Sequence, residues 1–454
     1  MWQTGDRTRD RTKDPSGIVL RGTNGPGSAG RLAALASLML LVAGTLVYPD
    51  PFVTVGFHLG SFRVSPMGLL FVAAAPALTW FSLRHRYLIK GSMIDIMLSI
   101  TLLFIGTRGL MEASTGNELG LVVAFVAYII LLYYGTAVVS QGSYRTLFIL
   151  LVVIGVMAAA YALIEFALGE NVLYGSILKE SVIPFPGHGY HRSGSLLGAP
   201  GPLGIFMVQV APFFLFFFMR AASRTRKVLW GLAILLVALA LLVTFSKGPW
   251  GTAVVLTIGG AVWLARHQTP AARSLLLLFL VVTVGLGTFS LVFYSTVKSG
   301  TVSKARTNES TEPREYMWSR VPRTFEANPL LGAGLWQGNA EIFRVNPAPV
   351  YKNRPSSIDN MYLTALVEQG LIGVILVAST LWLIGRRGWK LLKNGGDAAE
   401  WGWPPAVCMV AVMIAGLTSN DFMTWSNMVV FWLAAGMLRA LAEQERQKSL
   451  PDAC

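Results

Sequence analysis

The chain has 454 residues, of which 54% are hydrophobic and only 13% are charged, and its mean hydropathy is +0.56. About a quarter of the residues in a soluble domain are charged, and this sequence contains repeated apolar runs of roughly 20 residues, so it excludes an ordinary soluble protein and predicts a polytopic membrane protein. The net charge of +14 therefore does not indicate a nucleic-acid partner, because cationic loops orient membrane proteins and contact anionic lipid head groups.

The apolar runs predict an all-α integral membrane fold of about twelve transmembrane helices. Residues 1–30 are polar and basic and lack the apolar core of a cleavable signal peptide, so we expect a disordered cytoplasmic tail. The helices form an N-terminal group (31–168), a central group (199–297) and a C-terminal group (359–442), and residues 443–454 form a second tail. Their predicted bounds are 32–48, 66–83, 93–110, 119–140, 146–168, 199–219, 228–246, 250–265, 274–297, 359–385, 403–419 and 425–442.

The distribution of Lys and Arg predicts that both termini are cytoplasmic. In this orientation 23 of the 37 cations lie inside, and the two longest outside loops are a smaller one at 169–198 and a large one at 298–358. The large loop carries nine Lys or Arg against five Glu, an excess that the positive-inside tendency discourages on this face. Such a loop indicates an anionic ligand, for example a lipid-linked phosphate or pyrophosphate.

Two cations stand at helix ends on the outer side. Arg192 precedes the sixth predicted helix and could hold a phosphate bidentately, although an arginine that snorkels to lipid head groups is equally expected there. Lys247 is the single charge in the run from residue 228 to residue 265. A charge bordered by apolar helices favours a functional role, and the competing interpretation is a hairpin tip in which Lys247 and Gly248 make the turn.

The large loop contains a predicted surface helix that starts at Glu312-Pro313 and stops at Asn328-Pro329. Arg314 and Trp318 are four residues apart and would share one face of this helix, which also bears Arg320 and Arg323. The alternative is a solvated basic face.

Several carboxylates lie near the outer ends of the C-terminal helices. Asp359 and Asn360 open the tenth helix, where Ser357 or Asp359 would also serve as an N-cap. Glu368 lies about two and a half turns deeper and should face a cavity or pair with a cation. Asp421 lies between the last two helices, where a turn role is favoured.

Other chemistries are not indicated. The sequence has no phosphate-cradling glycine loop between a strand and a helix, no metal-ligand spacing among its five His, and no serine nucleophile elbow. The two Cys residues give no disulfide framework. We therefore expect no metal and no cofactor.

The order of the polar motifs resembles the O-antigen ligase and Wzy-type polysaccharide polymerase family of bacterial inner membranes. The resemblance spans roughly residues 185–380 and departs from the family at two positions: many members have Arg where this chain has Lys247, and the ligases have His where it has Asp359. The motifs are Arg192-Ser193-Gly194, Thr244-Phe245-Ser246-Lys247-Gly248, Arg314 with Trp318, Asn328-Pro329-Leu330-Leu331-Gly332-Ala333-Gly334, and Asp359-Asn360-Met361-Tyr362-Leu363 with Glu368-Gln369-Gly370.

The resemblance implies the fold of GT-C-like, lipid-dependent glycosyltransferases and a metal-independent reaction. The donor would be an undecaprenyl-pyrophosphate-linked oligosaccharide, and the enzyme would polymerise such units into exopolysaccharide or O-antigen at the periplasmic face. Arg192, Lys247 and Arg314 would bind the donor pyrophosphate, and Asp359 with Arg314 would be catalytic. The supporting residues would be Ser246, Asn360, Tyr362, Glu368, Arg320 and Arg323.

Two alternatives remain open. The first is a ligase that transfers finished glycan to a lipid or protein acceptor, and Asp359 favours a polymerase over it. The second is a non-enzymatic flippase or exporter of lipid-linked sugars, which should line a central cavity with cations, whereas the predicted helix interiors here are nearly free of charge. Expected partners are membrane lipids and other proteins of polysaccharide assembly and export.

Overall fold

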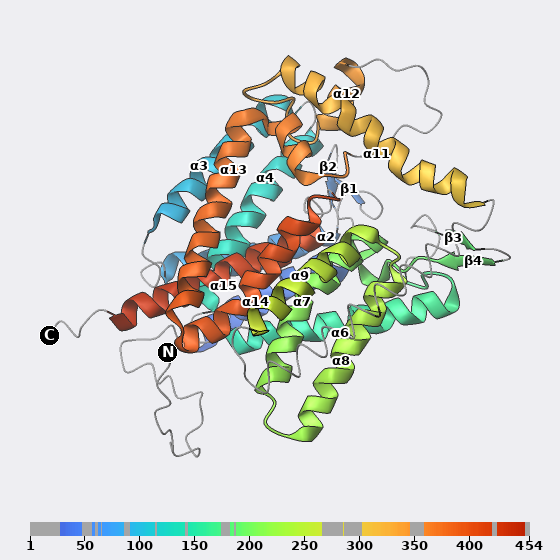
Figure 1. Cartoon of the computed structure of the whole chain (residues 1–454). Helices are drawn as coiled ribbons and strands as arrows, with labels where there is room; N and C mark the ends of the chain where they lie inside the picture. The colour runs from blue at the N-terminus through green and yellow to red at the C-terminus, as the bar shows by residue number, and fades with distance from the viewer. Residues whose placement is uncertain are drawn as a thin grey trace.

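The computed structural model describes residues 28–47, 57–59, 62–64, 66–85, 91–113, 116–140, 144–173, 182–185, 188–265, 285, 302–345, 358–419 and 425–449. Residues 1–27 of the first predicted tail, residues 450–454 of the second, all but Gly285 of the predicted helix at 274–297 and parts of both outer loops lie outside these residues. Residues 443–449, predicted as part of the second tail, instead continue helix α15. The described chain is helical, as predicted, with two short β-hairpins (Figure 1).

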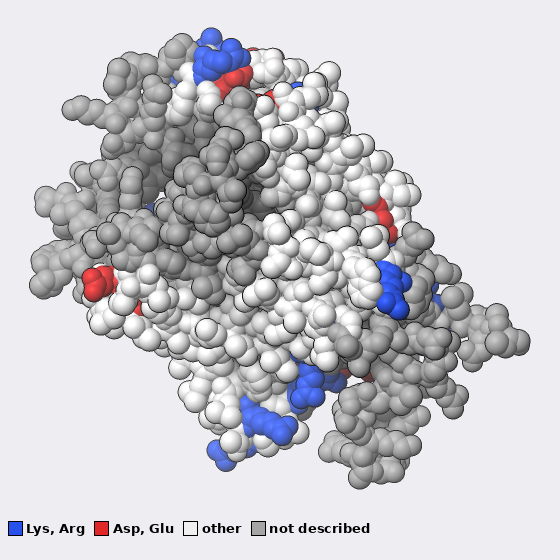
Figure 2. All heavy atoms as spheres, turned by 180° about the vertical axis from the view of Figure 1, so that it is seen from behind, with Lys and Arg blue, Asp and Glu red and all other residues white. Residues whose placement is uncertain are grey.

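The apolar runs form the helices that the sequence predicts for them. Seven helical segments of the described residues are long and apolar enough to cross a membrane, and the count of twelve stays a prediction. Most of the described surface in Figure 2 is uncharged, as a lipid-facing surface requires. The helices are α1 (Ser28–Val47), α2 (Pro66–Arg84), α3 (Met93–Glu112), α4 (Gly116–Ile130), the π-helix η2 (Leu131–Gly135), α5 (Thr136–Val139), α6 (Tyr144–Leu168), the 3₁₀ helix η4 (Ser195–Leu197), α7 (Pro200–Arg220), α8 (Arg224–Val243), α9 (Lys247–Ala265), α11 (Val302–Ala327), α12 (Gly338–Val345), α13 (Met361–Asn394), α14 (Gly396–Ala415) and α15 (Trp425–Ser449). The antiparallel hairpins are β1 (Phe57–Leu59) with β2 (Phe62–Val64), and β3 (Val182–Phe185) with β4 (His188–His191).

Residues 427–441 of helix α15 are all buried within the bundle. Val429, Val430 and Phe431 are each 0% exposed, and α15 packs against α14, α7, η2 and α5. The stretch 429–438 of α15 is apolar on every side, as expected for a helix segment in the interior of a bundle rather than at its lipid-facing surface.

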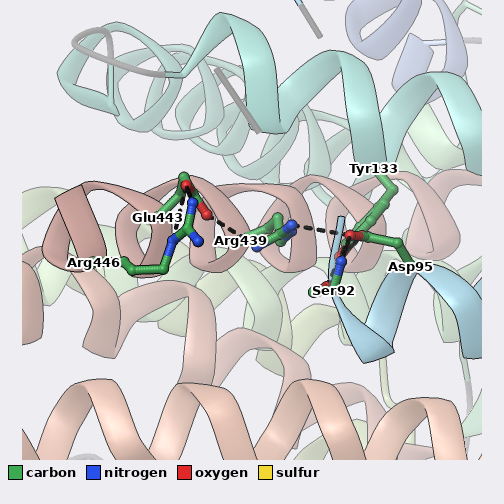
Figure 3. A network of polar contacts seen from close by, with 6 residues as sticks. All are labelled: Ser92, Asp95, Tyr133, Arg439, Glu443 and Arg446. Carbon is green, nitrogen blue, oxygen red and sulfur yellow. Dashed lines mark hydrogen bonds and ion pairs between the residues drawn. The ribbon is translucent and has the colours of Figure 1, made fainter. Parts of the chain in front are cut away.

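A network of polar contacts joins the start of α3 to the C-terminal part of α15 (Figure 3). The Nη2 atom of Arg439 lies 2.9 Å from Oδ2 of Asp95, and the Tyr133 hydroxyl, in the π-helix, lies 3.3 Å from Oδ1 of the same carboxylate. Glu443 accepts from Arg446 and pairs with Arg439. Both Arg439 and Glu443 are about 1% exposed, and each has a partner of opposite charge. A buried charge needs such a partner in an apolar surrounding. The network ties α3, η2 and α15 together.

One end of the bundle carries a cap, which we define as residues 302–345. Helices α11 and α12 lie across this end of the bundle in Figure 1. They have a small core of their own, to which the start of α13 contributes, formed by Met317, Val321, Ile342, Ile358 and Val367. The cap helix α11 ends before Asn328-Pro329 as predicted, but it begins at Val302, so the predicted start at Glu312-Pro313 is wrong.

Helix α13 is broken where the cap meets it. Gly370 has φ 61° and ψ −169°, a conformation that glycine adopts without a steric penalty. A helix break leaves backbone groups unpaired, which is costly at membrane depth. The loop 328–334 satisfies them with four backbone hydrogen bonds. These run from Ala333 N to Val367 O (2.8 Å), Gly334 N to Glu368 O (2.8 Å), Leu371 N to Pro329 O (2.9 Å) and Ile372 N to Leu330 O (3.1 Å).

Candidate functional site

The structure brings Arg192 onto the turn between α8 and α9. Its Nε donates to the Thr244 carbonyl (3.1 Å), and its Nη2 donates to the Ser246 hydroxyl (3.1 Å). Lys247, the first residue of α9, is exposed beside this turn. The hairpin-tip alternative is therefore correct only in part, because α9 begins at Lys247 and the turn consists of Thr244, Phe245 and Ser246. The first two cationic motifs thus form one cluster at a helix N-terminus, where the helix dipole and free N–H groups favour an anion.

A buried carboxylate that the sequence interpretation missed holds the Arg192 loop in place. Glu165, near the end of α6, is 2% exposed and accepts hydrogen bonds from the Ser193 hydroxyl (2.6 Å) and from the backbone N–H groups of Gly194 (3.3 Å) and Ser195 (2.6 Å). Ser195 itself has φ 50°. The loop is therefore fixed from behind by α6, and Arg192 is fixed in front by the α8–α9 turn.

The second cluster joins the cap to the start of α13. The Nε atom of Arg314 lies 3.1 Å from Oδ2 of Asp359, and the Trp318 indole N–H donates to the Ile358 carbonyl (2.7 Å). Arg314 and Trp318 use one face of α11, as their spacing predicts. The side chains of Arg314 and Asp359 are 37% and 35% exposed, and a pair this open contributes about 0–1 kcal/mol. A phosphate could therefore compete for Arg314 at little cost.

Asp359 does not cap α13, and that interpretation is wrong. The N-cap is Asn360, whose side-chain oxygen accepts from the N–H groups of Tyr362 and Leu363, both at 3.0 Å. Asp359 instead has φ 49°, a left-handed conformation that Asp and Asn tolerate better than most residues. The carboxylate of Asp359 is thus turned to Arg314 and not to its own helix.

Residues next to each cluster contact the same turn, 416–418, at the end of α14. A methyl group at Gly248, next to Lys247, would overlap the Thr418 hydroxyl. On the other side, the Asn360 amide donates to the Leu417 carbonyl (2.9 Å), and Met361 N donates to Gly416 O (2.9 Å). The N-termini of α9 and α13 therefore both lie against one three-residue turn.

The remaining predicted residues contact neighbouring parts of the bundle and of α11, or lie exposed. The Tyr362 hydroxyl donates to the Met413 carbonyl (2.7 Å) in α14. The Arg320 guanidinium stacks 4.1 Å from the ring centre of Tyr316, and Arg323 is exposed on α11. These two arginines are not brought into contact with Asp359 by any interaction that the described residues show.

Glu368 has a different partner from the one predicted. Within the described part of the chain it pairs with no cation; instead, the backbone N–H groups of Trp336 and Gly338 point at its carboxylate, so it caps the start of α12. Glu368 is 6% exposed and lies near Glu112, which pairs with Arg108. Its place in the structure is at the junction between the cap and the broken helix.

The arrangement can bind an anion. It combines three cationic side chains with the N-termini of two helices, and it adds one carboxylate, that of Asp359. Preorganised donors of this kind stabilise charge that develops on a leaving group. No group of three or more His, Cys, Asp or Glu residues that could hold a metal ion occurs in the described residues.

These features define a multi-pass helical membrane protein with cationic side chains near the start of α9 and beside the start of α13. Residues 232–378 match the family model described as O-antigen ligase, which supports the resemblance to the O-antigen ligase and Wzy-type family over that part of the chain. The family comprises glycosyltransferase-like enzymes. A search of curated proteins found no match. The matched region contains Lys247, Arg314, Asp359 and Glu368, whereas Arg192, Glu165 and the turn 416–418 lie outside it.

Proposed function

We propose that this protein transfers glycan from a lipid-linked pyrophosphate to a sugar hydroxyl, and that it polymerises undecaprenyl-pyrophosphate-linked oligosaccharides at the periplasmic face of the inner membrane. The observation that carries the proposal is that Gly248, next to Lys247, and Asn360, next to Asp359, contact the same turn, 416–418. Arg192 lies against Ser246 beside Lys247, and Arg314 pairs with Asp359. The family match supports a lipid-linked glycan as the substrate.

In the proposed reaction the acceptor hydroxyl attacks the anomeric carbon, and the bond from that carbon to the pyrophosphate breaks. Arg192, Lys247 and Arg314 stabilise the charge that develops on the pyrophosphate as it leaves. Asp359 accepts or orients the proton of the acceptor hydroxyl. No step requires a nucleotide sugar or a metal ion.

The test is glycan transfer by the purified protein in liposomes that contain the lipid-linked oligosaccharide of its own cell, with product length resolved on a gel. Because Asn360 provides the helix cap, Asp359→Asn removes only the charge, and Asn tolerates the same φ. We expect Asp359→Asn to be folded and strongly slowed, and Arg314→Lys to be impaired because an ammonium cannot replace a planar fork.

Asp397→Asn is the matched control, since Asp397 is an exposed carboxylate in the first turn of α14, at the far end of the bundle. Wild-type chain lengths from both Asp359→Asn and Arg314→Ala would overturn the assignment of the site. Transfer of finished glycan to a lipid acceptor, without growth of the polymer, would favour a ligase.

The orientation has its own test. Ser319 is exposed on the cap helix α11, so Ser319→Cys in a Cys454→Ser background should react with a membrane-impermeant maleimide from the periplasmic side. The remaining Cys408 is buried. Reaction in inside-out vesicles alone would reverse the orientation.

A further inference from the structure

The turn 416–418 touches both halves of the candidate site at once. Thr418 contacts Gly248 at the start of α9, and the Leu417 carbonyl accepts the amide of Asn360, the cap of α13. Asn360 therefore has two tasks: its oxygen caps α13, and its nitrogen fixes α13 to the turn. Any shift of the turn would move the helix that carries Asp359.

The contacts on both sides of the turn leave no free space. A methyl group on Gly248 would overlap the Thr418 hydroxyl, and a methyl group on Gly416 would overlap the side chain of Met361. By contrast, a methyl group on Gly251, one turn further along α9, would meet nothing within 4 Å. The close approach of α9 to the turn 416–418 is thus specific to the start of α9, where Lys247 lies.

We infer that the turn 416–418 is a positioning element that sets the spacing between Lys247 and Asp359. This inference rests on the proposed function, because the spacing matters only if a donor and an acceptor are held between these groups. A displacement of about 1 Å in a reacting geometry can lower a rate about a hundredfold. Thr418 and Leu417 act through the two helices and need not touch the substrate.

The experiment is a double-mutant cycle on Gly248 and Thr418. Gly248→Ala adds the methyl group that overlaps the Thr418 hydroxyl, and Thr418→Ala removes that hydroxyl. We expect Gly248→Ala to lower kcat for glycan transfer by about tenfold or more, with a much smaller change in KM for the lipid-linked donor. The double variant should recover most of the lost rate, because the overlapping atoms are no longer both present. Gly251→Ala is the matched control on the same helix and should keep the wild-type rate.

A second measurement follows the spacing without activity. Spin labels at Val255→Cys on α9 and Ile375→Cys on α13, both exposed positions, report the distance between the two helices. We expect this distance to change in Gly248→Ala, to stay the same in Gly251→Ala and to return in the double variant.

The outcomes separate the inference from the proposed function. The inference is wrong if the effects of Gly248→Ala on the transfer rate and on the distance are both no larger than those of Gly251→Ala. It is also wrong if adding Thr418→Ala to Gly248→Ala restores neither the rate nor the distance. If Gly248→Ala loses rate only in proportion to lost thermal stability, the turn is a packing contact and the inference is likewise wrong. If the wild-type protein transfers no glycan while the distances follow the cycle, the proposed function fails and the turn still sets the spacing.

Discussion

The carboxylate of Glu165 gives the sharpest prediction about the Arg192 loop. Glu165→Ala removes the acceptor of three hydrogen bonds and leaves two buried backbone N–H groups, those of Gly194 and Ser195, without it. An unsatisfied buried donor costs about 1–3 kcal/mol, and the Ser193 hydroxyl can rotate to another acceptor, so we expect the closed loop to lose about 3 kcal/mol. At about 1.4 kcal/mol for each factor of ten, the open population of the loop rises roughly a hundredfold.

Trypsin measures this opening, because the bond after Arg192 is cleaved only when the loop leaves Glu165 and the α8–α9 turn. Where opening is fast relative to cleavage, the cleavage rate follows the open population, so Glu165→Ala should be cut after Arg192 roughly a hundred times faster than the wild type. Glu165→Gln keeps one acceptor oxygen and should fall between the two. Glu170→Ala, an exposed carboxylate just beyond α6, is the control. Equal cleavage of the Glu165→Ala and Glu170→Ala proteins would refute the reasoning.

Three further predictions concern the cap and the start of α13. Gly370→Ala should abolish the docking of the loop 328–334 and lower the thermal midpoint in detergent, because a side chain at φ 61° is strained and its methyl group would overlap the backbone of Leu330. Gly385→Ala is the control, since Gly385 lies in open space on the same helix, and it should not change the thermal midpoint. Asn360→Ala should lower stability by about 1 kcal/mol through the lost cap, which a fall in thermal midpoint would show, and an unchanged midpoint would contradict the assigned cap. The Arg344 guanidinium holds the pKa of the Glu341 carboxyl below its ordinary value. The stabilisation from the Glu341–Arg344 pair is therefore present above the pKa of Glu341 in the unfolded chain and is lost as the pH falls through its lowered pKa in the folded protein. Acid should therefore lower the thermal midpoint of the wild type more than that of Glu341→Gln.

The apolar helices were predictable because each contains a long apolar run, and such a run indicates a membrane-spanning helix without knowledge of its tertiary contacts. The N-cap residue of α13 was not predictable, because Ser357, Asp359 and Asn360 are all competent N-caps. The choice falls on Asn360 since its amide also reaches the Leu417 carbonyl, 57 residues away, and no local rule contains that contact. The start of α11 was missed for a related reason, because Pro313 is an ordinary start signal and here it lies inside the helix.

The candidate site was predictable only in its charged members. Arg192, Lys247, Arg314 and Asp359 stand out because charge is rare beside membrane helices. The structure places Arg192 against Ser246, next to Lys247, and pairs Arg314 with Asp359. Glu165 gave little signal, since its partners are backbone groups of a loop almost 30 residues further on. The turn 416–418 has no side chain that signals chemistry, and its importance lies in its backbone and in the lack of space around it.

The break in α13 also bears on the assembly of the protein. When α13 enters the membrane, the amides of Leu371 and Ile372 and the carbonyls of Val367 and Glu368 have no partners within their own helix at Gly370. Because hydrocarbon offers no hydrogen-bond partners, these groups depend on the loop 328–334 for theirs. That loop is synthesised before α13. The break in α13 is therefore satisfied only together with docking of the loop, so the final form of α13 and the closure of the cap are coupled.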